Sequence, residues 1–345
     1  MSAATTILVL GMHRSGTSAF TRALSLAGAA LPRTLLEARS DNPDGYWESS
    51  RMVALDEAIL RSIGGHGLMA WTAAAESRLA AAAPGIAPTL ARAHDRESDR
   101  RDVVVMKDPR FCLLAAAHRA AVESIGRRCV AVLLVRDAAQ VARSLAPRNG
   151  VSAAYADLLW RQHVLLSEWH TRTIPRLIVR HAEFLADPVG VAGAVCELAG
   201  MPPPRAKDAI RAWVRPGESS PNENATGPDA SREIFERVAV DRARDADRID
   251  ALRRDALKAG DSCDPQCPPG WLEVQSDATV AAAQLAALAN EYELATGCAP
   301  THDVDGVLRS LDLRMGNGAD AAPAPRATLS PLEWLASRLR RGSRE

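Results

Sequence analysis

The chain has 345 residues, of which 47% are hydrophobic and 24% charged, so it can bury a sizeable core and is neither fibrous nor wholly disordered. Basic and acidic residues both number 42, and this zero formal charge argues against a protein built mainly to hold nucleic acid. No secretory pattern precedes the first apolar run, and no run is long enough to span a membrane. We therefore expect a cytoplasmic protein.

Four short apolar runs lack the alternation of a half-exposed strand, which is typical of parallel strands covered by helices on both faces. They are residues 6–10, 103–106, 129–135 and 177–179. Helical patterns lie between them, including an apolar stripe from Tyr155 to Trp169. Strands that alternate with helices predict a three-layer α/β domain with a parallel sheet, which we assign to residues 1–204.

The composition changes after the prolines at 202–204. Residues 216–230 predict an exposed loop, and charged and Ala-rich helices are expected over 231–259 and 276–296. We assign 205–315 to a mainly helical extension. Two pairs of residues in it, Cys263 with Cys267 and Cys298 with His302, have the spacing of zinc ligands, although scattered thiols that bind no metal are commoner.

Residues 316–345 are expected to form a Gly/Ala/Pro linker and a terminal amphipathic helix over 331–341. This helix combines leucines and a tryptophan with three arginines. We expect it to pack on its own domain, with peripheral contact to an anionic membrane or docking on a partner as the alternatives.

The first predicted strand leads directly into the turn Gly11-Met-His-Arg-Ser-Gly-Thr-Ser18. A glycine-bearing turn between a strand and a helix directs backbone N–H groups at one point and favours phosphate or sulfate. The spacing is close to G-x-x-x-x-G-K-[ST], but Thr17 stands where a nucleotide-triphosphate loop has lysine. Arg14 carries the cation instead. The alternative is a tight turn that binds nothing. The candidate anion-binding residues are His13, Arg14, Ser15, Gly16, Thr17 and Ser18, of which His13 could equally pack behind the anion.

Two motifs resemble the sulfotransferase family, whose sulfuryl donor is 3′-phosphoadenosine 5′-phosphosulfate (PAPS). Arg14-Ser-Gly-Thr-Ser18 looks like the family's 5′-phosphosulfate loop. Leu134-Val-Arg-Asp-Ala-Ala-Gln-Val-Ala-Arg-Ser-Leu145 is similar to its 3′-phosphate element, in which an arginine at a strand end and a serine eight residues later hold the 3′-phosphate. These places are taken by Arg136 and Ser144. The alternative is an Arg136–Asp137 pair and a surface serine.

The resemblance extends over about residues 5–200 and includes Asn42-Pro-Asp-Gly-Tyr-Trp-Glu48 and the segment 178–188. It implies a P-loop-like α/β fold, PAPS as the donor and no metal. The family's adenine-stacking tryptophan just after the loop is absent, because Ala19 stands there. The resemblance therefore leaves open which residues contact the adenine.

Sulfuryl transfer also needs cations at the leaving oxygen and a base for the acceptor proton. Arg14 and Lys107, one of only three lysines in the chain, suit the first task; the alternative for Lys107 is a strand-end lysine that extends its ammonium group to solvent. Family members that act on small molecules carry a histidine base two residues after this lysine, where the chain has Pro109. Members that modify carbohydrates or tyrosine use a glutamate shortly after the first helix. We expect Glu48 to be the base, with Asp108 as its competitor or as a residue that braces the turn.

Three histidines in helical stretches, His118, His163 and His170, are expected to be partly solvated and not catalytic. The sequence thus predicts a PAPS-dependent sulfotransferase that acts on a glycan, glycolipid or small-metabolite hydroxyl and binds no nucleic acid. One alternative is an ATP-dependent small-molecule kinase on a P-loop scaffold, which the missing loop lysine disfavours. Another is a non-catalytic nucleotide-binding or scaffold protein.

Overall fold

The computed structural model describes residues 4–39, 42–214, 228–240 and 246–262. Its centre is a four-stranded sheet in the order β2-β1-β3-β4 with every pair parallel. The strands are β1 (Thr5–Leu10), β2 (Val103–Lys107), β3 (Arg128–Val135) and β4 (Arg176–Arg180). All four predicted strands are confirmed to within about two residues at each end, because apolar runs of this length can be buried on both faces only inside such a sheet.

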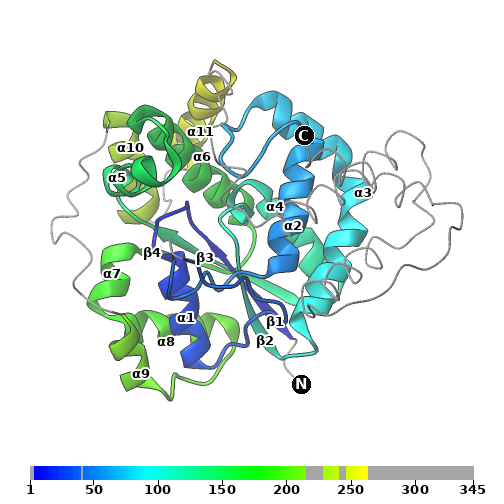
Figure 1. Ribbon diagram of the computed structural model, residues 1–345, viewed down its shortest axis with the longest axis vertical. Helices are drawn as coiled ribbons and strands as arrows, with labels where there is room; N and C mark the ends of the chain where they lie inside the picture. The colour runs from blue at the N-terminus through cyan, green and yellow to red at the C-terminus, as the bar shows by residue number, and fades with distance from the viewer. Residues whose placement is uncertain (1–3, 40–41, 215–227, 241–245, 263–345) are drawn as a thin grey trace, which may run out of the picture.

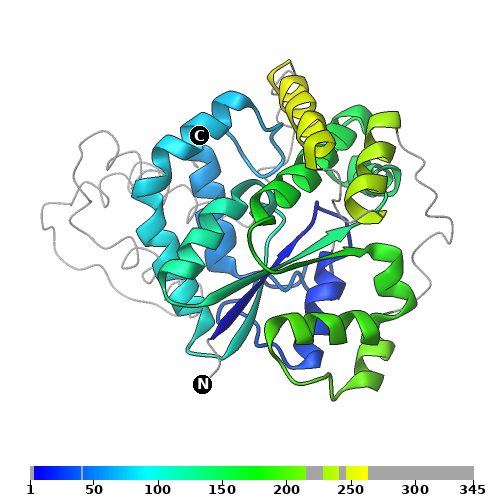
Figure 2. The same cartoon turned by 180° about the vertical axis from the view of Figure 1, so that it is seen from behind.

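Helices cover both faces of the sheet, as the two opposite views show (Figures 1 and 2). One face packs on α1 (Thr17–Ala27), α7 (His181–Ala186), α8 (Pro188–Ala199) and α9 (Lys207–Trp213). The other face packs on α2 (Ser50–Ser62), α3 (Ala73–Ser98), α4 (Phe111–Ser124), α5 (Ala138–Asn149) and α6 (Ala153–Thr171). Successive strand residues point to opposite layers: Leu8 belongs to the second core and Val9 to the first. The predicted three-layer α/β fold is confirmed.

The predicted extension begins on the same cores. In α9, Ile210 is buried against the first layer. Helix α10 (Asp229–Ile234), the π-helical segment Phe235–Val240 and helix α11 (Ala246–Asp261) add buried residues such as Leu252 to the second. Helix α11 packs along α6 (Figure 2). The boundary at residue 204 therefore does not separate two packing units within the described part of the chain.

Of the predicted charged helix over 231–259, the described residues are helical up to Val240, with a π-helical part from Phe235, and again from Ala246. The apolar stripe of α6 is also less regular than expected, because Trp169 is 36% exposed whereas Trp160 is fully buried. The predicted helices 276–296 and 331–341, the linker and the four candidate zinc ligands lie outside the described residues. No helix in the described ranges is long and apolar enough to cross a membrane.

The strand order determines where the site can form. Strand β1 lies between β2 and β3, so the carboxyl ends of these three strands are neighbours. Val9 is in register with Lys107, and Leu10 with Leu133. Segments that follow parallel strands meet at the carboxyl edge of a sheet, which is where α/β proteins bind ligands. The glycine turn, Lys107 and Arg136 therefore converge there.

Candidate active site

The glycine turn has the backbone of an anion-binding loop. Both Arg14 (φ 69°) and Gly16 (φ 83°) adopt left-handed conformations, and Ser15 N–H bonds the Met12 carbonyl at 3.1 Å. Helix α1 starts immediately afterwards at Thr17. Consecutive amides that turn in this way at a helix N-terminus form a concave positive site. A Cβ on Gly16 would lie 2.6 Å from the His181 ring, so a larger residue cannot replace it without movement.

The two predicted anion-binding elements meet at this turn. Arg136, at the end of β3, donates from Nη1 to the Arg14 carbonyl at 3.0 Å. Arg14 donates from Nε to the Ser144 hydroxyl, on α5, at 2.9 Å. Residues more than a hundred positions apart in the chain are thus in direct contact. Both Arg136 and Ser144 hold the cationic residue of the loop.

A single pocket connects these elements, with a cavity volume of about 370 Å³. Eight of the eleven residues predicted from the sequence line it: His13, Arg14, Gly16, Thr17, Ser18, Glu48, Lys107 and Arg136. Ser15, Asp108 and Ser144 are not part of its lining. Its lining carries six arginine and lysine side chains but only two carboxylates, although the whole chain has no net formal charge. The excess of cations suits a ligand with several negative charges.

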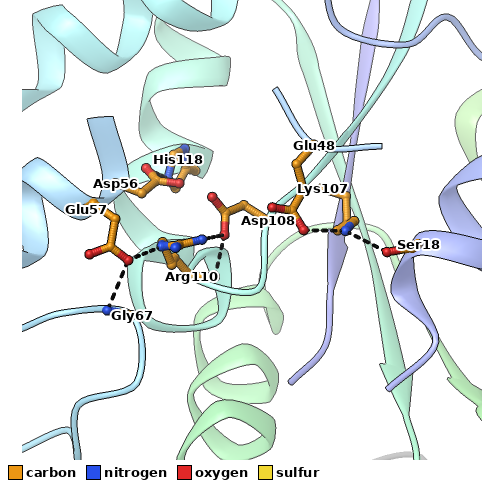
Figure 3. Close-up of polar contacts among 9 residues, drawn as sticks. All are labelled: Ser18, Glu48, Asp56, Glu57, Gly67, Lys107, Asp108, Arg110 and His118. Carbon is orange, nitrogen blue, oxygen red and sulfur yellow. Dashed lines mark hydrogen bonds and ion pairs between the residues drawn. The ribbon is translucent and has the colours of Figure 1, made fainter. Parts of the chain in front are cut away.

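Lys107 and Glu48, both in the pocket lining, form a buried ion pair (Figure 3). Lys107 Nζ lies 2.5 Å from Glu48 Oε1 and 3.2 Å from the Ser18 hydroxyl. Burial raises the pKa of the Glu48 carboxyl; Lys107 acts against this shift and the nearby Asp108 carboxylate adds to it. A carboxylate with a raised pKa is a stronger base, and it stands beside a cation that can neutralise a leaving oxygen.

Asp108, the competing candidate base, has a bracing position. Its Oδ1 accepts from the backbone N–H and from Nη1 of Arg110, both at 2.9 Å, and its side chain is fully buried. Arg110 also donates from Nε to Glu57 on α2. The structure thus favours the turn-bracing alternative for Asp108 over direct contact with an acceptor.

The histidines differ from the sequence-based expectation. His118 and His163 are completely buried, so the prediction that they are partly solvated is wrong; only His170 is intermediate. His118 lies between His94 at 3.0 Å and Asp56 at 2.9 Å, and these polar neighbours allow it to be buried. His13 is largely buried in the pocket wall, and burial together with nearby Arg110 holds its pKa well below the usual range.

The pocket contains residues that the sequence did not single out, Trp213 and His181 among them. Trp213, in α9, lines it and donates its indole N–H to the Ala19 carbonyl at 3.0 Å. Its ring packs edge-on against Trp47, with the centroids 6.1 Å apart. His181, which follows β4, packs against Gly16. The position of His181 after a predicted strand was a usable signal, whereas a lone tryptophan in a short helix beyond residue 204 carried none.

Among the described residues, no group of three or more His, Cys, Asp or Glu side chains could hold a metal ion. No family model and no curated protein matches the chain. Two solved structures similar to the chain are sulfotransferase domains. The domain from the Synechococcus PCC 7002 olefin synthase is 17% identical, with a TM-score of 0.39 and coverage of 76% of this chain and 95% of that one. The domain from the curacin biosynthetic pathway is 12% identical, with a TM-score of 0.37 and coverage of 67% of this chain and 83% of that one.

Proposed function

We propose that this chain is a PAPS-dependent sulfotransferase that moves a sulfuryl group to a hydroxyl of a glycan, glycolipid or small metabolite. The observation that carries the proposal is the contact of Arg136 and Ser144 with Arg14. It joins two cationic elements, each at a strand end, across one pocket. The lining cations come from the glycine turn (Arg14), the end of β2 (Lys107) and the end of β3 (Arg136), and an adenosine with a 3′-phosphate and a 5′-phosphosulfate can use cations from more than one of these elements.

The residues of the pocket fit such a donor. The left-handed turn at Arg14 and Gly16 offers backbone N–H groups for the phosphosulfate, and the N-terminus of α1 adds a positive end. We assign the 3′-phosphate to Arg136 and Ser144; the Ser144 hydroxyl, which here lies outside the pocket lining, would exchange its contact with Arg14 for the phosphate. Trp213 offers an aromatic surface beside Ala19, the position where the family's stacking tryptophan is absent, and we assign the adenine to it.

The chain's own residues divide the chemistry among them. When bound, PAPS supplies an activated sulfuryl group whose bond to the 5′-phosphate breaks as a bond to the acceptor oxygen forms. Glu48 accepts the proton that the acceptor hydroxyl loses. Lys107, within reach of both Glu48 and Ser18, neutralises charge on the leaving oxygen. Neither role requires a metal.

Calorimetry with adenosine 3′,5′-bisphosphate, 5′-AMP and ATP tests the donor assignment on the full chain. We expect clear preference for the bisphosphate, and loss of that preference in Arg136→Ala, because the 3′-phosphate loses its cation. Arg172→Ala is a matched control, since Arg172 pairs with Glu168 on α6 and is not part of the pocket lining. Equal affinity for all three nucleotides contradicts the proposal. Magnesium-dependent ATP turnover would support the kinase alternative instead.

Transfer itself is measured with ³⁵S-labelled PAPS and a panel of sugar, glycolipid and phenolic hydroxyl acceptors. A labelled product that depends on Lys107 supports the enzyme. Tight binding of the bisphosphate without transfer to any acceptor or to water would support the non-catalytic nucleotide-binding alternative.

A further inference from the structure

A second set of buried ionisable groups lies beside the Glu48–Lys107 pair (Figure 3). Glu57 and Asp56 come from α2, and Asp108 and Arg110 from the turn between β2 and α4. Each of these four side chains is at most 4% exposed. Four buried charged groups are costly unless they are paired, so their arrangement is a specific feature of the fold.

Arg110 joins the two elements that carry the proposed catalytic pair. Its Nε donates to Glu57 on α2, whose N-terminus directly follows Glu48. Its Nη1 donates to Asp108 at 2.9 Å, one residue after Lys107. Arg110 therefore connects α2 to the end of β2. The Lys107–Glu48 ion pair connects the end of β2 to the residue just before α2, so two ionic contacts link these elements. A shift of Arg110 would alter the distance between Glu48 and Lys107.

The same residues also set the charge around Glu48. In Figure 3, Asp108 lies between Arg110 and the Glu48–Lys107 pair. The groups that act on Glu48 are Lys107 from β2 and Asp108 and Arg110 from the turn that follows it. The two cations favour the ionised carboxylate and Asp108 opposes it. Asp108 Oδ2 is buried without a hydrogen-bond donor among the described residues, so its charge is only partly compensated.

We propose that Asp108 and Arg110 are positioning residues that, together with Glu57, hold Glu48 beside Lys107 and set the net charge that Glu48 faces. Asp108 is not part of the pocket lining, and Arg110, which does line the pocket, has its Nε and Nη1 held by Glu57 and Asp108. The inference rests on the proposed role of Glu48 as the base. Under this proposal the two candidate bases have different roles: Glu48 faces the pocket and takes the proton, and Asp108 acts only through its effect on Glu48.

The packing of the neighbouring loop supports this assignment. Gly67 N–H donates to Glu57 Oε1 at 3.2 Å and closes over the ion pair. A Cβ on Gly67 would lie 2.7 Å from Glu57 Oε1 and 2.9 Å from Arg110 Nε. The backbone thus approaches the charges so closely that a Cβ at this position could enter only if the Glu57 and Arg110 side chains moved. An alanine here would displace the Arg110–Glu57 pair without changing any charge.

The charge part of the proposal is tested by titrating Glu48 directly, with ¹³C-carboxyl-labelled glutamate in the full chain and the Glu48→Gln spectrum to identify the signal. We expect the Glu48 midpoint to move to lower pH in Asp108→Asn, which removes a negative neighbour, and to higher pH in Arg110→Met, which removes a positive one. Glu168→Gln is the matched control, because Glu168, on α6, is an equally buried carboxylate that pairs with Arg172 and Arg176. Opposite shifts cannot arise from general loosening of the fold.

If Glu48 titrates at the same pH in Asp108→Asn as in the wild type, the proposal that Asp108 sets the charge around Glu48 is wrong. If Arg110→Met does not fold, Arg110→Lys replaces it and should leave the midpoint close to that of the wild type. These titrations need neither donor nor acceptor. Failure of bisphosphate binding would therefore remove the donor assignment while the Glu48 midpoints stand, and the two failures are distinguishable.

The positioning part is tested with Gly67→Ala and PAPS as the probe, measuring hydrolysis at saturating donor, in which water accepts the sulfuryl group and sulfate and the bisphosphate are released. We expect the rate to fall on the order of 10²-fold, because a small displacement of Glu48 misaligns it with the reacting atoms. The donor concentration that gives half the maximal rate should change little. Gly85→Ala in α3 is the matched control, because its added Cβ meets no atom within 4 Å. An unchanged rate in a folded Gly67→Ala protein overturns the positioning role.

Discussion

The backbone one residue before Glu48 is in an unusual conformation. Trp47 has φ 59°, a left-handed value that costs a bulky residue about 1–3 kcal/mol. Its ring contacts offset this cost, since Arg22 lies 4.7 Å over the ring and Trp213 packs edge-on against it. The turn directs Glu48 into the interior beside Lys107. Backbone strain of this kind is characteristic of functional sites.

The role of Glu48 gives a prediction for its neutral isostere. In Glu48→Gln we expect sulfuryl transfer to fall by about 10²–10⁴-fold, since the acceptor proton has no base, while affinity for adenosine 3′,5′-bisphosphate changes little. Transfer of ³⁵S and calorimetry measure the two quantities. Glu37→Gln, an exposed carboxylate on the same connection between α1 and α2, should change neither. Unchanged transfer in Glu48→Gln would exclude it as the base.

Asp56 predicts a pH dependence of stability. Burial raises the pKa of its carboxyl to about 7, with His118 acting in the opposite direction. The ordinary value in an unfolded chain is about 3.9, so the folded protein holds a proton that the unfolded chain releases. The contribution of this proton to the free energy of unfolding is therefore fully present below about pH 3.9, and it is lost as the pH rises through about 7.

We expect the wild type to lose more free energy of unfolding between pH 5 and pH 8 than Asp56→Asn, which has no proton to release there. Urea denaturation at the two pH values measures the difference. Asp208→Asn, at a fully exposed aspartate, should behave as the wild type. Parallel losses in the wild type and Asp56→Asn would mean that Asp56 is ionised throughout this range.

At the scale of elements, the β1–α1 turn depends on a contact with the end of β4. Gly16 combines a positive φ with the close approach of His181, which begins α7. The Phe20 and Phe184 rings, on α1 and α7, pack with their centroids 5.0 Å apart and hold the two helices together below the turn. The shape of the anion-binding loop is thus set by two elements and not by the loop alone.

Gly16→Ala and Gly126→Ala separate the effect of the positive φ from the effect of the close approach of His181. Both glycines have positive φ, but a Cβ on Gly126 meets no atom within 4 Å. We expect both variants to lose stability, by about 1 kcal/mol or more, because alanine resists a left-handed conformation. Only Gly16→Ala should also lose affinity for adenosine 3′,5′-bisphosphate, measured by calorimetry. Full affinity in Gly16→Ala would show that the turn tolerates displacement of His181.

Helix α9 predicts a further effect on ligand binding. Trp213 should contribute about 1–3 kcal/mol of stacking to the adenine, which corresponds to a loss of about 10–100-fold in bisphosphate affinity in Trp213→Ala. Binding of inorganic pyrophosphate, which has no base, should be unchanged. Trp169→Ala is the control, because Trp169 is exposed on α6 and is not part of the pocket lining. Equal losses for both ligands would place the adenine elsewhere.

At the scale of the whole molecule, the helices beyond residue 204 belong to the same fold as the sheet. Leu252 in α11 shares one hydrophobic core with Leu165 in α6 and Leu133 in β3. Helix α9 contributes Trp213 to the pocket. The α/β unit and the described part of the extension should therefore unfold together.

We expect Leu252→Ala and Leu165→Ala each to lower the free energy of unfolding by about 2–5 kcal/mol, as cavities in one core do. Thermal unfolding, followed by both tryptophan fluorescence and circular dichroism, should remain a single transition in each. Arg254→Ala, an exposed position on α11, should have no comparable effect. A separate early transition in Leu252→Ala alone would indicate an independent extension.

The strands and the glycine turn could be predicted because their signals are local. An unbroken apolar run is compatible with few structures other than a covered parallel strand, and the turn follows such a strand directly. Lys107 and Arg136 could be placed near the turn because the carboxyl ends of parallel strands share an edge. What the sequence determined by itself is therefore the layer architecture and the edge at which the site forms.

The tertiary structure alone decided which side chains meet at that edge. Glu48 reaches Lys107 through the packing of α2, and Trp213 reaches the pocket through the packing of α9 on α1. His118 could be buried only because Asp56 and His94 come to it from other helices. The energy of such a contact depends on the distance and burial of both partners, which a pattern along the chain does not contain. The local sequence of Asp108 was equally compatible with a base and a brace, and its contact with Arg110 favours the brace.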